Sequence, residues 1–187
     1  MLSQLIVAKN LRMVVTEIFT DRDRKSASAT RRIAHDIGWK PQIILPLGSS
    51  SPTAIMQPAG PEKALGAITS GWAKTASDPQ WDKDPGIVSL REFTRQWMPG
   101  ADPNDAFVAG GYSSAQMLVH ILKQCGNDLT RENVMKQALN LKGFTLPTYL
   151  PGITLNTSPT DYELYAQLKL QKFNGTSWVP FGEMVSK

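Results

Sequence analysis

The amino-terminal part of the chain alternates between strand-like and helix-like patterns, and this alternation restricts the fold most. Residues 13–19 have the β-branched content of a strand, and residues 42–45 form a short apolar strand of the kind buried in parallel sheets. Between them, Ser26 or Ser28 can N-cap a helix that ends at Gly38. A strand, a helix and a second strand form a βαβ unit, so we expect an α/β fold with a parallel sheet flanked by helices.

The rest of the chain predicts further strands and three helices. A strand is expected over residues 66–70, and a short helix over 53–57 precedes it. The three helices are expected over residues 90–98, 112–125 and 131–141, with Ser89 and Thr130 capping the first and third. The second carries apolar residues at the spacing of a core-facing stripe: Ala115, Leu118, Val119 and Leu122. A strand over 165–173 and the Asn174-Gly175 turn complete the pattern.

The charge distribution argues against nucleic-acid binding. The chain has 187 residues and a net charge of +4, and residues 1–40, with eight Lys or Arg against four acids, carry the whole excess. Nucleic-acid binders usually combine a basic stripe with stacking aromatic residues or a groove-reading helix. Here Asp21 and Asp23 interrupt the basic run, and Phe19 is its only nearby aromatic residue. We therefore expect no nucleic-acid partner.

Cysteine content and hydropathy exclude further classes. The single cysteine, Cys125, cannot form an internal disulfide, and its place in an apolar helical run predicts a buried, inert thiol. The longest apolar stretches are far shorter than the roughly 20 residues that span a bilayer, so no membrane insertion is expected. Residues 2–7 are too short for the apolar region of a signal peptide, and the chain as written is expected to stay in the cytoplasm.

No pattern of catalytic residues emerges from the sequence. Residues 48–52 contain three serines but lack the Gly-x-Ser-x-Gly elbow of a nucleophile. His35 and His120 lie inside predicted helices and are interpreted as structural. Gly110-Gly111 lacks the lysine of a phosphate loop and is interpreted as a tight turn that leads into a helix. The chain is expected not to be an enzyme and to need neither metal nor other cofactor.

Three aspartates, Asp78, Asp82 and Asp84, are interpreted as part of a solvated hinge rather than a calcium loop. They lie in the polar, turn-rich segment 74–86, which indicates an unpacked connection between two lobes. Such a connection leaves a cleft in which loops at strand ends can hold a small ligand. The loop after residues 42–45 offers hydroxyl groups suited to a carboxylate or an amide, and Phe107 and Tyr112 could line a cleft or belong to the core.

Several segments in the same order resemble the branched-chain amino-acid-type substrate-binding proteins of ABC transporters. The resemblance covers roughly residues 28–187. It is carried by these segments: Ile33 to Pro41, Gln57 to Gly60, Asp78 to Trp81, Gly111 to Gln116, Cys125 to Val134, Leu150 to Ile153, Asn156 to Asp161 and Phe173 to Gly175.

The resemblance implies part of a type I periplasmic-binding-protein fold, with two α/β lobes that close on a small ligand. It assigns residues 1–72 to the second lobe, 73–88 to an interlobe crossover, 89–164 to the first lobe and 165–187 to a returning second-lobe hairpin. Members are about twice this long, so the chain resembles their carboxyl-terminal half. It is therefore expected to bind ligand weakly or not at all when alone.

The resemblance also implies a set of ligand-binding residues, a ligand class and a partner. The residues are Leu47, Gly48, Ser49, Ser50, Ser51, Phe107 and Tyr112. The ligand is a small amino-acid-like or aromatic carboxylate, and the partner of the intact protein is a membrane permease. The family is periplasmic. Where amino-acid binders place an acid for the ligand ammonium, this loop reads Leu47-Gly48-Ser49, which favours aromatic or other small carboxylates.

The alternative from the residues alone is a small self-sufficient α/β domain. It would be a sensor, or an esterase that uses Ser49 or Ser50 as its nucleophile.

Overall fold

The computed structural model describes residues 13–15 and 35–186, and it divides the chain into two compact units. Unit 1 comprises Met1–Ser70 and Leu170–Phe181, and unit 2 comprises Gly71–Lys169 and Gly182–Lys187. The chain therefore passes from unit 1 to unit 2, returns to unit 1 at Leu170 and enters unit 2 again at Gly182.

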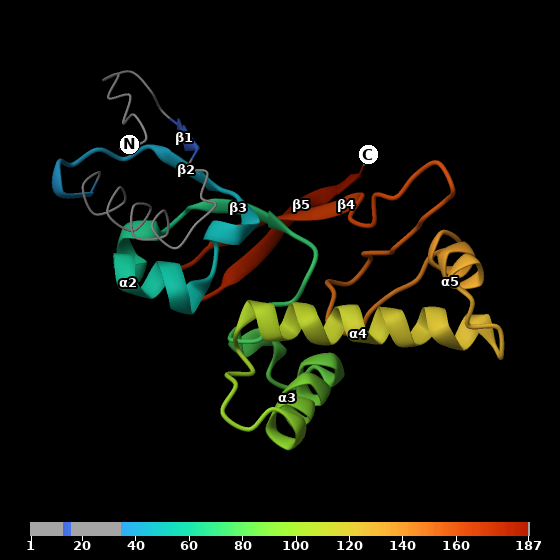
Figure 1. The fold of residues 1–187 in the computed structure, drawn as a ribbon. Helices are drawn as coiled ribbons and strands as arrows, with labels where there is room; N and C mark the ends of the chain where they lie inside the picture. Colours follow the sequence, from blue (N-terminus) through green and yellow to red (C-terminus); the bar gives the residue numbers. More distant parts are fainter. Residues whose placement is uncertain (1–12, 16–34, 187) are drawn as a thin grey trace, which may run out of the picture. The chain divides into compact units, whose positions relative to one another are not determined.

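One five-stranded sheet organises the strands, in the order β1-β2-β3-β4-β5 (Figure 1). β1 pairs in parallel with β2, and β2 pairs in parallel with β3. This confirms the predicted parallel α/β arrangement, although the helix predicted between the first two strands lies mostly outside the described residues. The bounds of the strands are Met13–Val15, Gln42–Leu45, Ile68–Gly71, Gln167–Phe173 and Trp178–Ser186.

The core of unit 1 lies between the sheet and three short helical turns. The turns are η2 (Pro52–Met56), α2 (Gln57–Ala59) and η3 (Pro61–Ala64). Leu45 of β2 packs with Ile55 and Met56 of η2, and Phe173 and Trp178 of the last two strands join them with ring centroids 5.2 Å apart. The short helix expected over residues 53–57 is confirmed as η2 and the start of α2.

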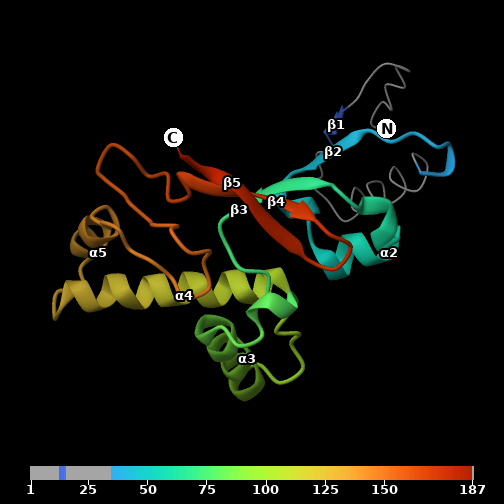
Figure 2. The same ribbon diagram turned by 180° about the vertical axis from the view of Figure 1, so that it is seen from behind.

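Unit 2 contains the three helices α3 (Pro85–Trp97), α4 (Ala106–Cys125) and α5 (Arg131–Ala138) (Figure 2). Thr130 caps α5 as predicted, with its side chain accepting from the Asn133 N–H. Cys125 is buried at the end of α4, and its thiol donates to the Ile121 carbonyl. The expected burial of this thiol is confirmed.

Two helices begin earlier than predicted because aspartates rather than serine or glycine mark their starts. The Asp84 carboxylate accepts from the backbone N–H groups of Gly86 and Ile87, so α3 begins at Pro85 and not after Ser89. Asp105 accepts from the Phe107 N–H and starts α4. The predicted turn at Gly110-Gly111 is wrong, because α4 already runs through both glycines.

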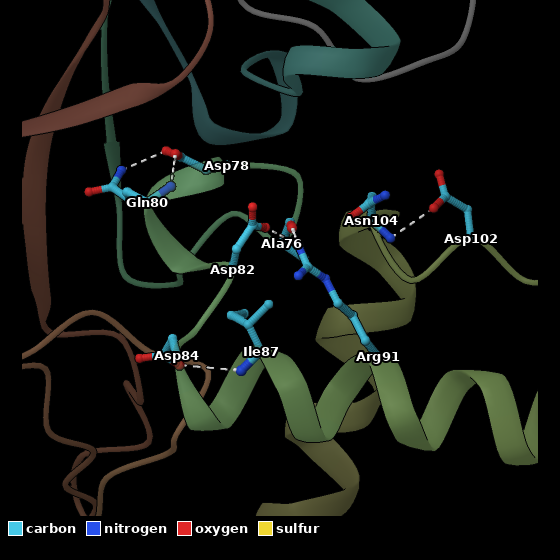
Figure 3. A network of polar contacts seen from close by, with 9 residues as sticks. All are labelled: Ala76, Asp78, Gln80, Asp82, Asp84, Ile87, Arg91, Asp102 and Asn104. Carbon is cyan, nitrogen blue, oxygen red and sulfur yellow. Dashed lines mark hydrogen bonds and ion pairs between the residues drawn. The ribbon is translucent and has the colours of Figure 1, made fainter.

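The segment 74–86 is packed and not an open hinge (Figure 3). Ala76 and Asp78 are 4% and 2% exposed, and the Asp78 carboxylate accepts from the Gln80 backbone and side chain. Asp82 pairs with Arg91 at 2.8 Å, while Asp84 pairs with a lysine. The expectation of a solvated segment fails because its carboxylates find partners inside unit 2.

The apolar stripe of α4 does not lie in the core as its spacing predicted. Leu118, Val119 and Leu122 are 50%, 49% and 37% exposed. The buried side chains of the same helix are Ser113, Ile121 and Cys125. The prediction from helical spacing is wrong here because a different face of α4 packs on unit 2.

Candidate functional site

The predicted ligand loop follows β2 at its carboxyl-terminal end, which is where parallel sheets commonly place binding loops. After Pro46 the chain turns into a single 3-10 turn, η1 (Leu47–Ser49). Ser50 then ends this turn, with its backbone N–H donating to the Leu47 carbonyl. The structure therefore gathers the five predicted loop residues, 47–51, in one compact loop of unit 1.

The loop presents its residues unequally to solvent. Leu47 and Gly48 are exposed and Ser51 is half-buried, whereas Ser49 and Ser50 are buried. The surface that a solute could touch is thus formed by Leu47, Gly48 and Ser51. A Cβ added at Gly48 would meet no atom within 4 Å, so the space above this glycine is open.

Ser50 holds the loop in shape. Its hydroxyl donates to the Leu47 carbonyl at 2.7 Å, and its own carbonyl accepts from the Trp178 indole N–H at 2.7 Å. Trp178 belongs to the buried core of unit 1, so these bonds tie the loop to the strand that returns at the end of the chain.

Ser49 differs from Ser50 because its buried hydroxyl has no hydrogen-bond partner. A buried hydroxyl without a partner costs free energy, whereas a satisfied one stabilises the fold by about 1 kcal/mol.

We expect Ser50→Ala to lower the free energy of unfolding by about 1 kcal/mol, since it removes the bond to Leu47. Ser49→Ala is expected to leave stability unchanged or to raise it by up to about 1 kcal/mol, because it removes an unsatisfied group. Urea unfolding of both variants checks this contrast. An equal loss of stability in the two variants would contradict the assigned bonding of the loop.

The two predicted aromatic residues both lie on α4 in unit 2. Phe107 is 74% exposed in the first turn of the helix. Tyr112 is half-buried and its ring lies 5.1 Å from that of Phe93 in a tilted arrangement. Tyr112 also lines an open pocket of about 430 Å³, and Phe107 does not. The two aromatic residues therefore have different surroundings on α4, since Tyr112 lies at a pocket and Phe107 is largely exposed.

The pocket in unit 2 contains polar residues that the sequence reasoning did not select. It lies between α3, α4 and residues 144–147. His120 stacks on Phe144 with ring centroids 4.3 Å apart, and the Gln116 side-chain oxygen is buried without a hydrogen-bond partner. The signal in the sequence was the spacing of four residues from Tyr112 to Gln116 to His120, which places all three on one side of a helix.

The arrangement does not favour the hydrolase alternative. Ser49 has no exposed surface, and the Ser50 hydroxyl proton is directed to a backbone carbonyl. Neither serine is thus presented as a nucleophile with a base beside it. In the described ranges, 13–15 and 35–186, no group of three or more His, Cys, Asp or Glu residues could hold a metal ion.

The structure is similar to solved solute-binding proteins of ABC transporters. A branched-chain amino acid ABC transporter protein from Thermus thermophilus with bound valine matches with a TM-score of 0.76 and 16% identity. A leucine-binding protein from Thermotoga maritima matches with a TM-score of 0.60 and 15% identity. A solute-binding protein from Rhodopseudomonas palustris HaA2, in complex with p-hydroxybenzoic acid, matches with a TM-score of 0.65 and 10% identity. No protein-family model and no curated protein matches the sequence.

These matches cover nearly all of this chain but less than half of each neighbour. The covered shares are 96% of this chain and 47% of the Thermus protein, 93% and 44% for the Thermotoga protein, and 94% and 45% for the Rhodopseudomonas protein. The chain therefore has the fold of part of a type I periplasmic binding protein, and the resemblance found in its sequence is confirmed at the level of the fold.

Proposed function

We propose that this chain is part of a solute-binding component of an ABC transporter and that the complete protein captures a small carboxylate. The observation that carries the proposal is the shared fold of nearly the whole chain with proteins that hold valine and p-hydroxybenzoic acid. Both solutes are small carboxylic acids. The protein would act by binding, since ligand stabilises one arrangement of the two lobes over another.

Within this proposal the two units are parts of two lobes. Residues 1–72 and 165–187 would belong to the second lobe, 73–88 to the crossover and 89–164 to the first lobe. The two units follow this division only in part, since unit 2 also contains residues 71–88, 165–169 and 182–187. This chain spans less than half of the length of its structural neighbours. The complete ligand-binding site would therefore include residues outside these 187. The isolated 187-residue chain would therefore bind its ligand weakly or not at all.

The ligand would contact the loop after β2 through its exposed positions. Leu47, Gly48 and Ser51 offer the surface, while Ser49 and Ser50 shape the loop from beneath. From unit 2, Phe107 and Tyr112 would supply aromatic contacts. The loop contains no acid to pair with an ammonium group, which favours carboxylates that lack one.

The proposed partner is the membrane permease of the transporter, and the proposed location is the periplasm. Neither requires the chain itself to enter a membrane. Among the residues that the structure describes, no helix is long and apolar enough to cross a bilayer.

Gly48 allows a test with a matched control. Gly48→Asp places a carboxylate on the exposed loop surface without steric conflict, so the affinity for a carboxylate solute should fall at least about tenfold by like-charge repulsion. Gly48→Asn has nearly the same shape and no charge, and its affinity should stay within about threefold of the parent protein. Isothermal titration calorimetry measures both variants in the complete protein. Equal affinities of the Gly48→Asp and Gly48→Asn variants for the carboxylate would contradict a contact between this loop and the ligand.

A further inference from the structure

The turn between β4 and β5 contains the one asparagine of the sequence that a glycine follows, Asn174-Gly175. Asn174 is exposed, so water and hydroxide reach its side chain. Gly175 has no Cβ to shield its nitrogen, and its φ of +101° lies in the left-handed region that glycine adopts without strain. The side-chain amide of Asn174 and the backbone nitrogen of Gly175 are therefore both accessible in this turn.

Hydrogen bonds hold the Asn174 side chain over the turn. Its Oδ1 accepts from the backbone N–H groups of Thr176 at 2.9 Å and of Ser177 at 2.8 Å. Its Nδ2 donates to the Ser177 hydroxyl at 3.2 Å. The bond from Thr176 closes a ring of atoms that contains both Asn174 Cγ and the Gly175 nitrogen, which keeps these two atoms near each other. Among the described residues, none accepts a backbone hydrogen bond from the Gly175 N–H.

The two N–H groups on Oδ1 lie where negative charge would develop in a reaction between these atoms. Hydroxide removes the Gly175 proton, and the nitrogen then bonds to Cγ and drives negative charge onto Oδ1. Preorganised N–H donors stabilise such an oxygen. The Cγ–Nδ2 bond breaks, and Nδ2 leaves as ammonia with a proton from water, which restores the hydroxide. The product is a five-membered succinimide ring.

Water opens this ring at either of its two carbonyl carbons. When the bond from the Gly175 nitrogen to Cγ breaks, residue 174 becomes aspartate. When the bond to the backbone carbonyl carbon breaks, residue 174 becomes isoaspartate. The main chain of isoaspartate runs through Cβ and Cγ, so it is one carbon longer than before.

The turn joins two strand ends that hold the loop 47–51. Phe173 and Trp178 flank the turn and pack together in the core of unit 1. The Trp178 indole N–H donates to the Ser50 carbonyl at 2.7 Å. The turn itself is closed by the Asn174 N–H, which donates to the Ser177 carbonyl at 3.1 Å. An extra main-chain carbon between residues 174 and 175 changes the path that this bond closes and shifts Trp178 relative to Ser50.

We propose that Asn174 is a site of spontaneous modification, at which the folded turn converts asparagine into aspartate and isoaspartate, and that the isoaspartate form loosens the Trp178 bond to Ser50. The reaction consumes water and releases ammonia, with hydroxide as the base. Every group involved lies in unit 1, so the proposal holds whichever solute the complete protein binds.

Mass spectrometry of the purified full chain, incubated at mildly alkaline pH, tests the modification. Trypsin releases residues 173–187 as one peptide, in which conversion replaces NH₂ by OH and fragmentation distinguishes aspartate from isoaspartate. The same incubation is repeated in guanidinium chloride, which keeps the Asn174-Gly175 sequence but removes the N–H groups from Oδ1. Conversion in the folded chain should be at least as fast as in the unfolded chain. A slower reaction in the folded chain overturns the proposal, because the fold would then protect Asn174.

Asn156 is the internal control in the folded chain. It is also exposed, and its Oδ1 accepts from the Gly143 N–H. The nitrogen that follows it, in Thr157, donates to the Leu141 carbonyl and is not free to attack. Asn174 should therefore convert at least about tenfold faster than Asn156. A smaller ratio of the two rates overturns the proposal.

Asn174→Asp separates the effect of the longer main chain from that of the new charge. This variant carries the aspartate product on a normal backbone, and its carboxylate can still accept from Thr176 and Ser177. The isoaspartate form of the incubated chain is separated by chromatography and compared with it by NMR. Hydrogen exchange of the Trp178 indole should be at least about tenfold faster in the isoaspartate form, since the bond to Ser50 opens more often. Exchange at the same rate in both overturns the proposed link to the loop 47–51.

Discussion

Asp84→Ala is expected to lower the free energy of unfolding by about 3 kcal/mol, because it removes a helix cap and half of a largely buried ion pair. The carboxylate caps α3 through the N–H groups of Gly86 and Ile87. Its other oxygen lies 2.6 Å from Lys74 Nζ, and the two side chains are 18% and 9% exposed. Without the carboxylate, the lysine would keep the Pro147 carbonyl and the face of Trp81 as its partners among the described residues.

Asp82 supplies the control for this prediction. It also forms an ion pair, with Arg91 at 2.8 Å, but its side chain is 57% exposed. Exposed pairs contribute little, so Asp82→Ala should cost less than about 1 kcal/mol. Chemical denaturation of both variants measures the difference. Equal losses would contradict the larger contribution of the Asp84 ion pair and cap.

The pH dependence of stability gives the same network a second test. Burial raises the pKa of Asp84. The hydrogen bond and the charge of Lys74, together with the two backbone N–H groups, lower this pKa by a larger amount, so it lies below 3.8. A carboxyl whose pKa is lowered by folding contributes stability above its unfolded pKa and loses it as the pH falls. The stability difference between the parent chain and Asp84→Asn, which keeps a capping oxygen, should therefore shrink below pH 3.8. A difference that stays constant into strong acid would contradict this role of the charge.

Gly86→Ala is expected to destabilise the chain by about 3 kcal/mol, at the upper end of overpacking effects. An added Cβ would lie 2.2 Å from the Pro147 carbonyl oxygen and 2.4 Å from its carbon. Both are backbone atoms, so no side-chain rotation relieves the overlap. Residues 86 and 147 would have to separate, and the Lys74 bond to the same carbonyl would be lost.

The same substitution at Gly110 should have the opposite sign. Gly110 lies inside α4, and its added Cβ would meet no atom within 4 Å. Alanine is favoured over glycine in a helix interior by about 0.5–1 kcal/mol, so Gly110→Ala should stabilise the chain by that amount. Thermal unfolding compares the two variants directly. A destabilised Gly110→Ala, or an unaffected Gly86→Ala, would refute this packing.

Local patterns predicted the elements well where local interactions decide them. The strand over 42–45 and the Thr130 cap follow from residue type alone. The predicted starts of α3 and α4 are too late because the prediction uses neither Asp84 nor Asp105 as a cap, although an aspartate before a helical stretch is a strong cap. The Asp78 carboxylate was expected in solvent, and its burial depends on Gln80 reaching it, which spacing does not reveal.

The candidate site was less predictable because it depends on which sides of the loop 47–51 and of α4 are buried in the folded chain. Residue type identified the loop 47–51, but not that Ser49 and Ser50 point into unit 1 while Leu47 and Gly48 remain exposed. Helical spacing identified the apolar stripe of α4, but spacing cannot say whether the described residues or another part of the fold cover it.

The central claim is that this chain is part of a two-lobed solute-binding protein, and calorimetric titration tests it most directly. Valine, leucine and p-hydroxybenzoate are titrated into the native gene product and into the isolated 187-residue chain. The account predicts micromolar binding of at least one of these carboxylates to the native product and no measurable binding to the isolated chain. Micromolar binding to the isolated chain, or no binding of any of the three to the native product, would contradict it.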